Sequence, residues 1–312
     1  MLGRRRFGQR VGLLAACLAL AAGAPRGTAR PTLAIERQDQ WSTWWRADHA
    51  PERWAAAEPR VTRALAWRRL AGGVEWATAR LAGSAPAWRT RLIVVRLDPR
   101  RVRFELALDL ADPSGRPAWT IDRAPPGALV AVNAGQFVGS MPWGWVVMEG
   151  TQRLRPGVGP LSSALALDTS GTVRWIAGDS LRLPANGVRT AFQSYPTLLR
   201  DDGSVPNALR ASGRGVDLGH RDGRLAIGQD RDGRVLLVMT RFAALGGLAE
   251  GLPVGPTTPE MAAVMGALGA RDAVMLDGGI SAQMVLREPA SGRTWRWPGW
   301  RKVPMALITY PR

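Results

Sequence analysis

The sequence contains very little cysteine, histidine or lysine. Its 312 residues include one cysteine, Cys17, two histidines and one lysine, Lys302. A disulfide scaffold is excluded, because Cys17 has no second cysteine to pair with. Metal sites built from several His or Cys ligands are disfavoured for the same reason, so we expect no metal and no cofactor. A single Ca²⁺ held by aspartate side chains is the one metal that the composition leaves open.

Long apolar segments are also scarce. Only one apolar run, near the N-terminus, is long enough to be considered for membrane insertion, which excludes a multi-span membrane protein. Disorder as the main state is excluded too, because 46% of the residues are hydrophobic and 21% are charged. The length suits one large domain or two of moderate size.

Acidic residues are too few to balance the basic ones. Lys and Arg number 42 against 25 Asp and Glu, a formal net charge of +17. Such a balance would suit nucleic acid, anionic lipid or an acidic glycan. The arginines are spread along the whole chain, however, and no nucleic-acid recognition module is present. We therefore expect no nucleic-acid partner, whereas peripheral contact with an anionic cell envelope remains open. The oligomeric state has no signature in the sequence.

The N-terminus has the pattern of a signal peptide. Four arginines between positions 4 and 10 precede an apolar run over residues 11–24, and small residues follow to position 29. We assign residues 1–29 to the signal peptide and expect an exported, periplasmic or secreted protein. Residues 14–17 also resemble a bacterial lipobox, but the apolar run continues beyond Cys17, so a lipid anchor is the less favoured alternative.

Residues 30–71 are rich in Trp and Arg. Trp41, Trp44 and Trp45 are spaced by three and four residues, which predicts one face of a helix. Pro51 and Pro59 divide this region into short helices. We therefore expect a helical extension that packs on the main domain through its tryptophans. An aromatic platform for stacking sugars is the alternative.

From residue 72 to residue 312 the sequence predicts many strands and few helices. Apolar runs bounded by Gly, Pro and Asp predict strands over residues 90–97, 102–110, 128–133, 145–148, 163–168, 172–176, 225–228, 235–240, 273–276 and 305–309. One helix is clear: Thr258 caps it, Pro259 lies in its first turn and Gly269 ends it. The absence of regular strand–helix alternation favours an α+β fold with mixed or antiparallel sheets.

Four segments carry polar groups at positions suited to chemistry. The strongest is Leu276-Asp277-Gly278-Gly279-Ile280-Ser281, in which an apolar strand leads to a carboxylate and two glycines allow close approach of a ligand. The others are Asn133-Ala134-Gly135-Gln136-Phe137, Gln193-Ser194-Tyr195-Pro196 and Arg224-Leu225-Ala226-Ile227-Gly228. Taken singly, each also fits an ordinary turn or strand end.

In their order along the chain, the four segments resemble the motifs of the phosphodiester glycosidase family. A Pro142-Trp143-Gly144 step after the Asn133 segment strengthens the match. The resemblance spans residues 72–310. It departs from the family pattern at Ala134, Gln136, Tyr195 and Ala282, and Tyr195 stands where a small residue is usual. The resemblance implies an enzyme that cleaves the bond between the anomeric carbon of a sugar and a phosphodiester.

The implied chemistry needs a carboxylate near the anomeric carbon and groups that stabilise the departing phosphate. We expect Asp277 to supply the carboxylate, as nucleophile or base, and Arg224 to clamp the anion, with Asn133 as a further catalytic group. The predicted substrate-binding residues are Gly135, Gln193, Ser194, His220, Gly278, Gly279 and Ser281. A second carboxylate is not distinguished among Glu149, Asp217, Asp222 and Asp230. His220 is a candidate proton donor, although a structural hydrogen bond is the favoured role.

Two other functions remain open at this point. One is a non-catalytic protein that binds an anionic envelope polysaccharide through the same pocket. The other is a basic surface binder, whose affinity would fall steeply with salt.

Overall fold

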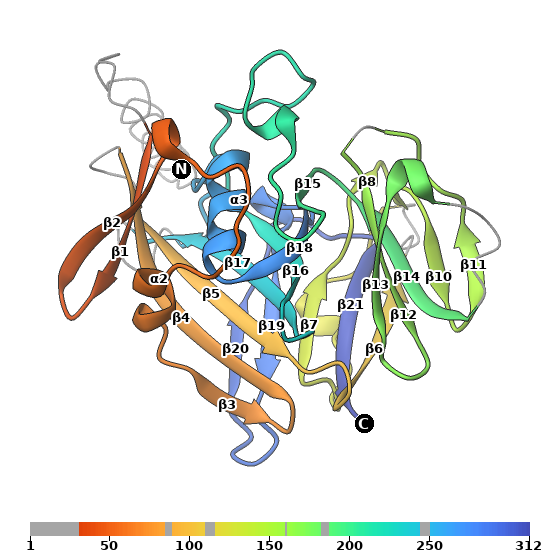
Figure 1. Ribbon diagram of the computed structural model, residues 1–312. Helices are drawn as coiled ribbons and strands as arrows, with labels where there is room; N and C mark the ends of the chain where they lie inside the picture. The colour runs from red at the N-terminus through yellow and green to blue at the C-terminus, as the bar shows by residue number, and fades with distance from the viewer. Residues whose placement is uncertain (1–30, 85–88, 110–115, 160, 182–186, 244–249) are drawn as a thin grey trace, which may run out of the picture.

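A computed structural model describes residues 31–84, 89–109, 116–159, 161–181, 187–243 and 250–312 (Figure 1). These residues form three β-sheets and one small hairpin, together with two α-helices. Every strand pairing within them is antiparallel. The expected strand-rich fold with few helices is confirmed, and β structure predominates.

The largest sheet has nine strands. Its order is β15 (Thr197–Leu199), β18 (Ala270–Met275), β16 (Leu225–Asp230), β17 (Val235–Phe242), β5 (Arg89–Leu97), β4 (Val74–Gly83), β1 (Thr32–Arg37) and β2 (Gln40–Arg46), and β3 (Arg68–Ala71) pairs with β4.

Each of the two smaller sheets has five strands. One contains β11 (Thr151–Leu154), β10 (Val146–Met148), β14 (Val188–Ser194), β12 (Ser163–Asp168) and β13 (Val173–Ala177). We call it the β14 sheet. The other, the β7 sheet, contains β20 (Thr294–Trp297), β19 (Met284–Arg287), β7 (Val130–Asn133), β21 (Met305–Pro311) and β6 (Val102–Leu108). Strands β8 (Phe137–Val138) and β9 (Met141–Pro142) form the hairpin.

The nine-stranded sheet is buried on both faces at its centre. Within β5, Ile93 and Val95 pack in one apolar cluster with strands of the β7 sheet, whereas Leu92 and Val94 pack in another with helix α3 (Thr258–Ala267). Because both faces are covered, β5 is a continuous apolar run rather than an alternating one. The short helix α2 (Pro59–Ala64) contributes Val61 to the second cluster.

Helix α3 is held at its N-terminus by a capping box. The Thr257 hydroxyl accepts a hydrogen bond from the Glu260 N–H, and the Glu260 carboxylate accepts one from the Thr257 N–H. The cap is therefore Thr257, one residue before the predicted Thr258. Gly269, at φ +90°, ends the helix in the left-handed region, as the sequence predicts.

Gly266 gives a test of packing on this helix. A methyl group on Gly266 would overlap the indole ring of Trp54, whose nearest atom would lie 2.2 Å from the new carbon. We expect Gly266→Ala to lower the free energy of unfolding by roughly 1–3 kcal/mol, despite the better helix propensity of alanine. Urea unfolding of the purified protein measures this. Gly127→Ala is the control, since nothing lies within 4 Å of the added atom; an equal loss in both variants would contradict the packing argument.

Most predicted strands are confirmed within two residues of their predicted ends, and residues 163–168 match strand β12 at both ends. The exception is the strand predicted over residues 273–276, because β18 begins earlier, at Ala270.

The helix predicted for Trp41, Trp44 and Trp45 is wrong. All three lie in strand β2, which forms a hairpin with β1 through Gln38 and Asp39, both at positive φ. A bulge between Leu33 and Ala34 shifts the register, which explains why consecutive tryptophans at 44 and 45 are both buried. Strand pairing and the β preference of Trp and Thr outweigh the helical spacing.

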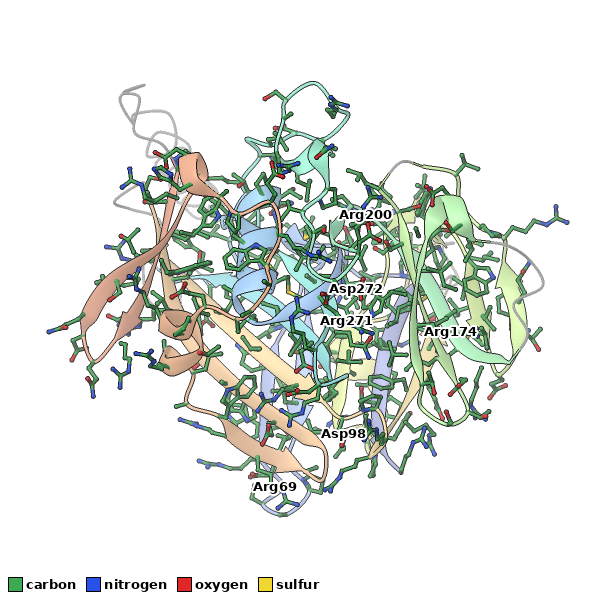
Figure 2. The ribbon with its side chains drawn as sticks, viewed as in Figure 1. Arg69, Asp98, Arg174, Arg200, Arg271 and Asp272 are labelled. Atoms are coloured by element: carbon green, nitrogen blue, oxygen red, sulfur yellow. The ribbon has the colours of Figure 1, made fainter. Side chains whose placement is uncertain are left out.

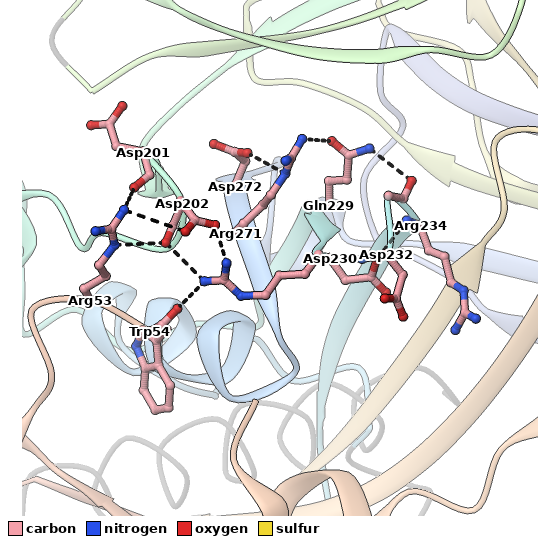
Figure 3. A network of polar contacts seen from close by, with 12 residues as sticks. Arg53, Trp54, Asp201, Asp202, Gln229, Asp230, Asp232, Arg234, Arg271 and Asp272 are labelled. Carbon is pink, nitrogen blue, oxygen red and sulfur yellow. Dashed lines mark hydrogen bonds and ion pairs between the residues drawn. The ribbon is translucent and has the colours of Figure 1, made fainter. Parts of the chain in front are cut away.

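Strands β1, β2 and β3 of residues 31–71 belong to the nine-stranded sheet, and the predicted boundary at residue 71 falls at the end of β3, which pairs with β4. The Trp54 N–H donates to the Gly203 carbonyl at 2.9 Å, and the Trp54 carbonyl accepts from Arg231 at 2.9 Å. Arg231 also pairs with Asp202, and the Arg53 guanidinium donates to the Asp202 carbonyl at 3.2 Å. Figure 3 shows Arg53, Trp54 and Asp202 in this network. The predicted signal peptide, with Cys17, lies outside the described residues.

Candidate functional site

Strands from all three sheets end at one place. Strand β18 leads to Asp277, β7 leads to Asn133 and β14 ends at Ser194. The Asp277 N–H donates to the Gly135 carbonyl at 3.0 Å, and the Ser194 hydroxyl donates to the Met275 carbonyl at 2.5 Å. The Leu276 N–H donates to the Leu225 carbonyl at 2.8 Å, so all four motifs that the sequence singles out meet around Asp277.

The carboxyl group of Asp277 has the features of a reactive group. Its Oδ2 atom is buried and has no hydrogen-bond partner among the described residues. Burial raises the pKa of Asp277, and the nearby charge of Asp222 raises it further. A hydrogen bond from Ser281 and the charge of Arg301 act in the opposite direction. A buried, unpaired carboxylate oxygen is costly to maintain, which is typical of functional sites.

Two glycines bring a second loop against the Asp277 motif. The Gly279 N–H donates to the Gly223 carbonyl at 2.6 Å. A Cβ atom on Gly278 would lie 2.5 Å from the Gly223 oxygen, and one on Gly279, at φ +56°, would lie 2.7 Å from Asp222 Oδ2. The absence of side chains at Gly278 and Gly279 thus allows this close approach.

Among the candidate carboxylates, the close approach of the two loops brings Asp222 to the Asp277 motif. Burial raises the pKa of Asp222, while the charge of Arg224, the Gly223 N–H and His220 act against that shift. The other candidates have different roles or positions. Asp217 accepts hydrogen bonds from the N–H groups of Gly219 and His220, Asp230 accepts those of Asp232 and Arg234 in a turn, and Glu149 is exposed.

His220 lies at the edge of this site. Its Nε2 atom is 3.7 Å from Asp222 Oδ2, and its side chain is exposed. The neighbouring Arg221 forms two hydrogen bonds, at 2.7 and 2.8 Å, with the fully buried Glu260 of helix α3. The loop that carries His220 and Asp222 is thereby fixed to the N-terminus of the helix.

Backbone carbonyls occupy part of the guanidinium of Arg224. Its Nε atom donates to the Pro256 carbonyl at 2.8 Å, and its Nη2 atom donates to the His220 carbonyl at 2.6 Å. Arg241 behaves similarly, since its Nη2 atom donates to the carbonyls of Ala282 and Pro298. These two buried arginines hold the backbone of the loops around Asp277.

Asn133 also makes its hydrogen bonds within the protein. Its Nδ2 atom donates to the Asp277 carbonyl at 2.8 Å, and its Oδ1 atom accepts from the Gln283 N–H at 2.9 Å. Asn133 is 1% exposed, so it positions the Asp277 segment rather than contacting a ligand from the surface.

Gln193 points away from Asp277. Its side-chain oxygen accepts from the N–H groups of Trp145 and Gly157, and its amide donates to the Gly157 carbonyl and the Ser162 hydroxyl. Gln193 therefore fixes the loop around Gly157.

Arg301 is a site residue that the sequence did not reveal. Its N–H donates to the Ile280 carbonyl at 3.1 Å, and its own carbonyl accepts from the Gln283 side chain at 3.2 Å. The guanidinium lies 4.5 Å from the centroid of the Phe137 ring, so Phe137 supports the cation beside the Asp277 motif. A single arginine in a chain this rich in arginine gives no sequence signal.

The site contains two carboxylates, Asp222 and Asp277, whose pKa values are raised. Pairs of carboxylates with shifted pKa values are typical of glycosidase sites. The sequence comparison agrees with this class. Residues 126–310 match the model of the phosphodiester glycosidase family, and the chain belongs to that family.

Solved structures show the same fold. The catalytic domain of zebrafish N-acetylglucosamine-1-phosphodiester alpha-N-acetylglucosaminidase, described as auto-inhibited by its pro-peptide, is 16% identical with a TM-score of 0.55. The match covers 94% of this chain and 93% of that one. A putative exported protein from Burkholderia pseudomallei is 21% identical with a TM-score of 0.50, covering 75% of this chain and 77% of that one. No curated protein matches the sequence.

Two further observations apply to the described residues only. No three His, Cys, Asp or Glu side chains among them are grouped so that they could hold a metal ion. No helix in this part of the chain is long and apolar enough to cross a membrane.

Proposed function

We propose that the protein is a hydrolase that cleaves a sugar-1-phosphodiester between the anomeric carbon and the phosphate oxygen. The observation that carries the proposal is the buried, unpartnered Oδ2 atom of Asp277, which lies where the three sheets meet and within the family motif.

In the proposed reaction, the bond from C1 to the phosphate oxygen breaks and the departing phosphate monoester keeps the electron pair. Asp277 faces the anomeric carbon as nucleophile or base and stabilises the oxocarbenium-like state. Water supplies the hydroxyl group of the released sugar. Because a phosphate monoester leaves readily, little general-acid assistance is needed. Arg301, supported by Phe137, contacts the phosphate, whereas Arg224 positions the loop of Asp222.

The test is sugar release by the purified chain, residues 30–312, from a panel of α-linked sugar-1-phosphodiesters. The matching alkyl glycosides, which lack the phosphate, serve as comparison substrates. We expect release from phosphodiesters and much slower release from the alkyl glycosides, which have a poorer leaving group. Binding of anionic glycans without release from any substrate would instead support a non-catalytic envelope protein.

The pH dependence tests the proximity of Asp222 to Asp277. The like charge of Asp222 raises the pKa of Asp277, so Asp222→Asn should lower that pKa. Since the ionised Asp277 is the active form, activity falls as pH drops through this pKa, and the acidic limb of kcat/KM should move to lower pH in the variant. Carboxyl NMR titration of Asp277 gives the same answer even if turnover is lost. Asp217→Asn is the control; an unmoved Asp277 pKa in Asp222→Asn would contradict the assignment.

We also propose that the protein is exported through residues 1–29, acts on a glycan or glycoconjugate of the envelope, and needs no cofactor. Its basic charge would favour an anionic envelope surface rather than nucleic acid. In support, the labelled arginines in Figure 2 come from separate parts of the fold: Arg69 from β3, Arg174 from β13, Arg271 from β18 and Arg200 from the turn after β15. Sequencing the N-terminus of the protein recovered from cell fractions would test the cleavage and show whether Cys17 is retained and lipidated.

A further inference from the structure

Two aromatic rings pack together beside the site. The ring centroids of Trp143 and Tyr195 lie 4.7 Å apart with an interplanar angle of 74°, so one ring meets the other edge-on. Tyr195 is 40% exposed, so part of its ring is open to solvent. The nearby β8–β9 hairpin exposes Val138 and Met141 as well.

Hydrogen bonds place Tyr195 close to the Asp277 motif. The Ser194 hydroxyl donates to the Met275 carbonyl at 2.5 Å, and the Met275 N–H donates to the Pro196 carbonyl at 3.0 Å. Tyr195 is the residue between these two attachments, and Met275 precedes Asp277 by two positions. The tyrosine is thus fixed to the strand that delivers the carboxylate.

Gln136 holds both aromatic residues of the pair. Its carbonyl accepts from the Trp143 N–H at 2.7 Å, and its side-chain amide donates to the Tyr195 carbonyl at 3.2 Å. Gln136 directly follows Gly135, whose carbonyl accepts from the Asp277 N–H. A Cβ atom on Gly157 would lie 2.8 Å from the indole of Trp143, so Trp143 is packed closely against that glycine. The pair is therefore rigid.

We propose that Tyr195, braced by Trp143, is a stacking subsite for a second sugar ring, so that the substrate is a glycan of at least two sugar units. An exposed ring on a segment that is hydrogen-bonded to the strand before Asp277 offers a flat apolar surface and a hydroxyl group at little entropic cost. Those are the features that recognise a pyranose, which has an apolar face and a polar rim. Gln136 and Tyr195 are two of the positions at which this chain departs from the family motifs, so the subsite belongs to this chain in particular.

The inference rests on the proposed function, and substrates of matched chemistry test it. All of them contain the same sugar-1-phosphodiester. They differ in whether a methyl group or a second sugar is attached, in one series to the phosphate and in another to the reacting sugar. We expect Tyr195→Gly to lower kcat/KM on a two-sugar substrate about tenfold and to change it less than about twofold on the methyl substrate. Tyr195→Phe should retain most of the activity, and Val138→Ala is the exposed control. Equal losses on all substrates, or no loss on any, would overturn the subsite.

A binding measurement separates failure of the subsite from failure of the proposed function. Oligosaccharides of the panel are titrated calorimetrically into the protein with Asp277→Asn, with and without Tyr195→Gly. If loss of Tyr195 weakens binding about tenfold and the wild-type protein hydrolyses no substrate of the panel, the subsite is retained and the enzyme is rejected. If the wild-type protein hydrolyses the substrates and binding is equally strong with and without Tyr195, the enzyme is retained and the subsite is rejected.

Discussion

Asp277→Asn is expected to reduce sugar release by roughly 10³-fold or more while leaving the protein folded. Asparagine has nearly the same shape but cannot act as nucleophile or base. The Asp277 N–H and carbonyl, which bond to Gly135 and Asn133, remain in place. The measurement is single-turnover sugar release at several pH values, with circular dichroism as the check on folding.

The same substitution has a predicted effect on stability. Because burial raises the pKa of Asp277, the folded protein binds this proton more tightly than the unfolded chain does. Stability therefore falls as pH rises from the ordinary aspartate range through the raised pKa, and the cost is fully present above that raised pKa. Asp277→Asn should be at least as stable as the wild type above the raised pKa, and this advantage should vanish at low pH.

Asp230→Asn is the matched control for Asp277→Asn. Asp230 is also buried with a raised pKa, but its Oδ1 atom accepts the N–H groups of Asp232 and Arg234 in a turn, and the Asn side chain can accept the same bonds. Turnover should survive this change. Sugar release that persists in Asp277→Asn would show that another residue supplies the carboxylate.

Gly278→Ala is expected to lower kcat/KM about a hundredfold. Gly278 has φ −99°, which alanine adopts without strain, so the effect comes from space alone. The new Cβ would lie 2.5 Å from the Gly223 carbonyl oxygen, a backbone atom that can move only with its loop. The loop of Asp222 must therefore shift away from the loop of Asp277. We expect a modest loss of stability, roughly 1–3 kcal/mol, together with the large loss of activity.

The control for Gly278→Ala is Gly219→Ala. The added atom there would meet only Asp217 Oδ1, at an ordinary 3.6 Å, in the same loop region. Steady-state kinetics on both variants, with thermal unfolding alongside, separates displacement of the carboxylates from general destabilisation. A Gly278→Ala enzyme with unchanged kcat/KM would mean that the spacing of these two loops does not matter for the reaction.

Local patterns in the sequence were enough to predict part of the interior of the fold, although the internal strands β4, β14 and β19 were not predicted. Strands β5 and β12 are apolar runs bounded by turn residues, and helix α3 carries its cap and stop signals in its own sequence. The N-terminal tryptophans misled because their spacing fits a helix, whereas the bulged pairing of β2 with β1 decides their structure. That pairing depends on a partner strand, which a local pattern does not contain.

The same limit applies to the site. Asp277 was identifiable because a strand, a carboxylate and two glycines are adjacent in the sequence. The role of Arg224 was not, because its acceptors are backbone carbonyls, one of them at Pro256, and carbonyls leave no trace in a sequence. Arg301 comes into position through Ile280 and Phe137, which are far from it along the chain. Asp222 became distinct from the other acidic residues only once the glycine contacts were known.

The order of strands in the β7 sheet has a consequence for how the protein folds. Strands β6 and β7 follow one another closely in the chain yet do not pair, because β21, which begins about 170 residues after β7 ends, lies between them (Figure 1). Until β21 has been synthesised, β6 and β7 each have an unpaired edge that can pair with a non-native strand. Closing so long a loop is slow, which places folding in the millisecond-to-second range or beyond. The site around Asn133 and Asp277 can therefore assemble only once residues 305–311 are available to pair with β7.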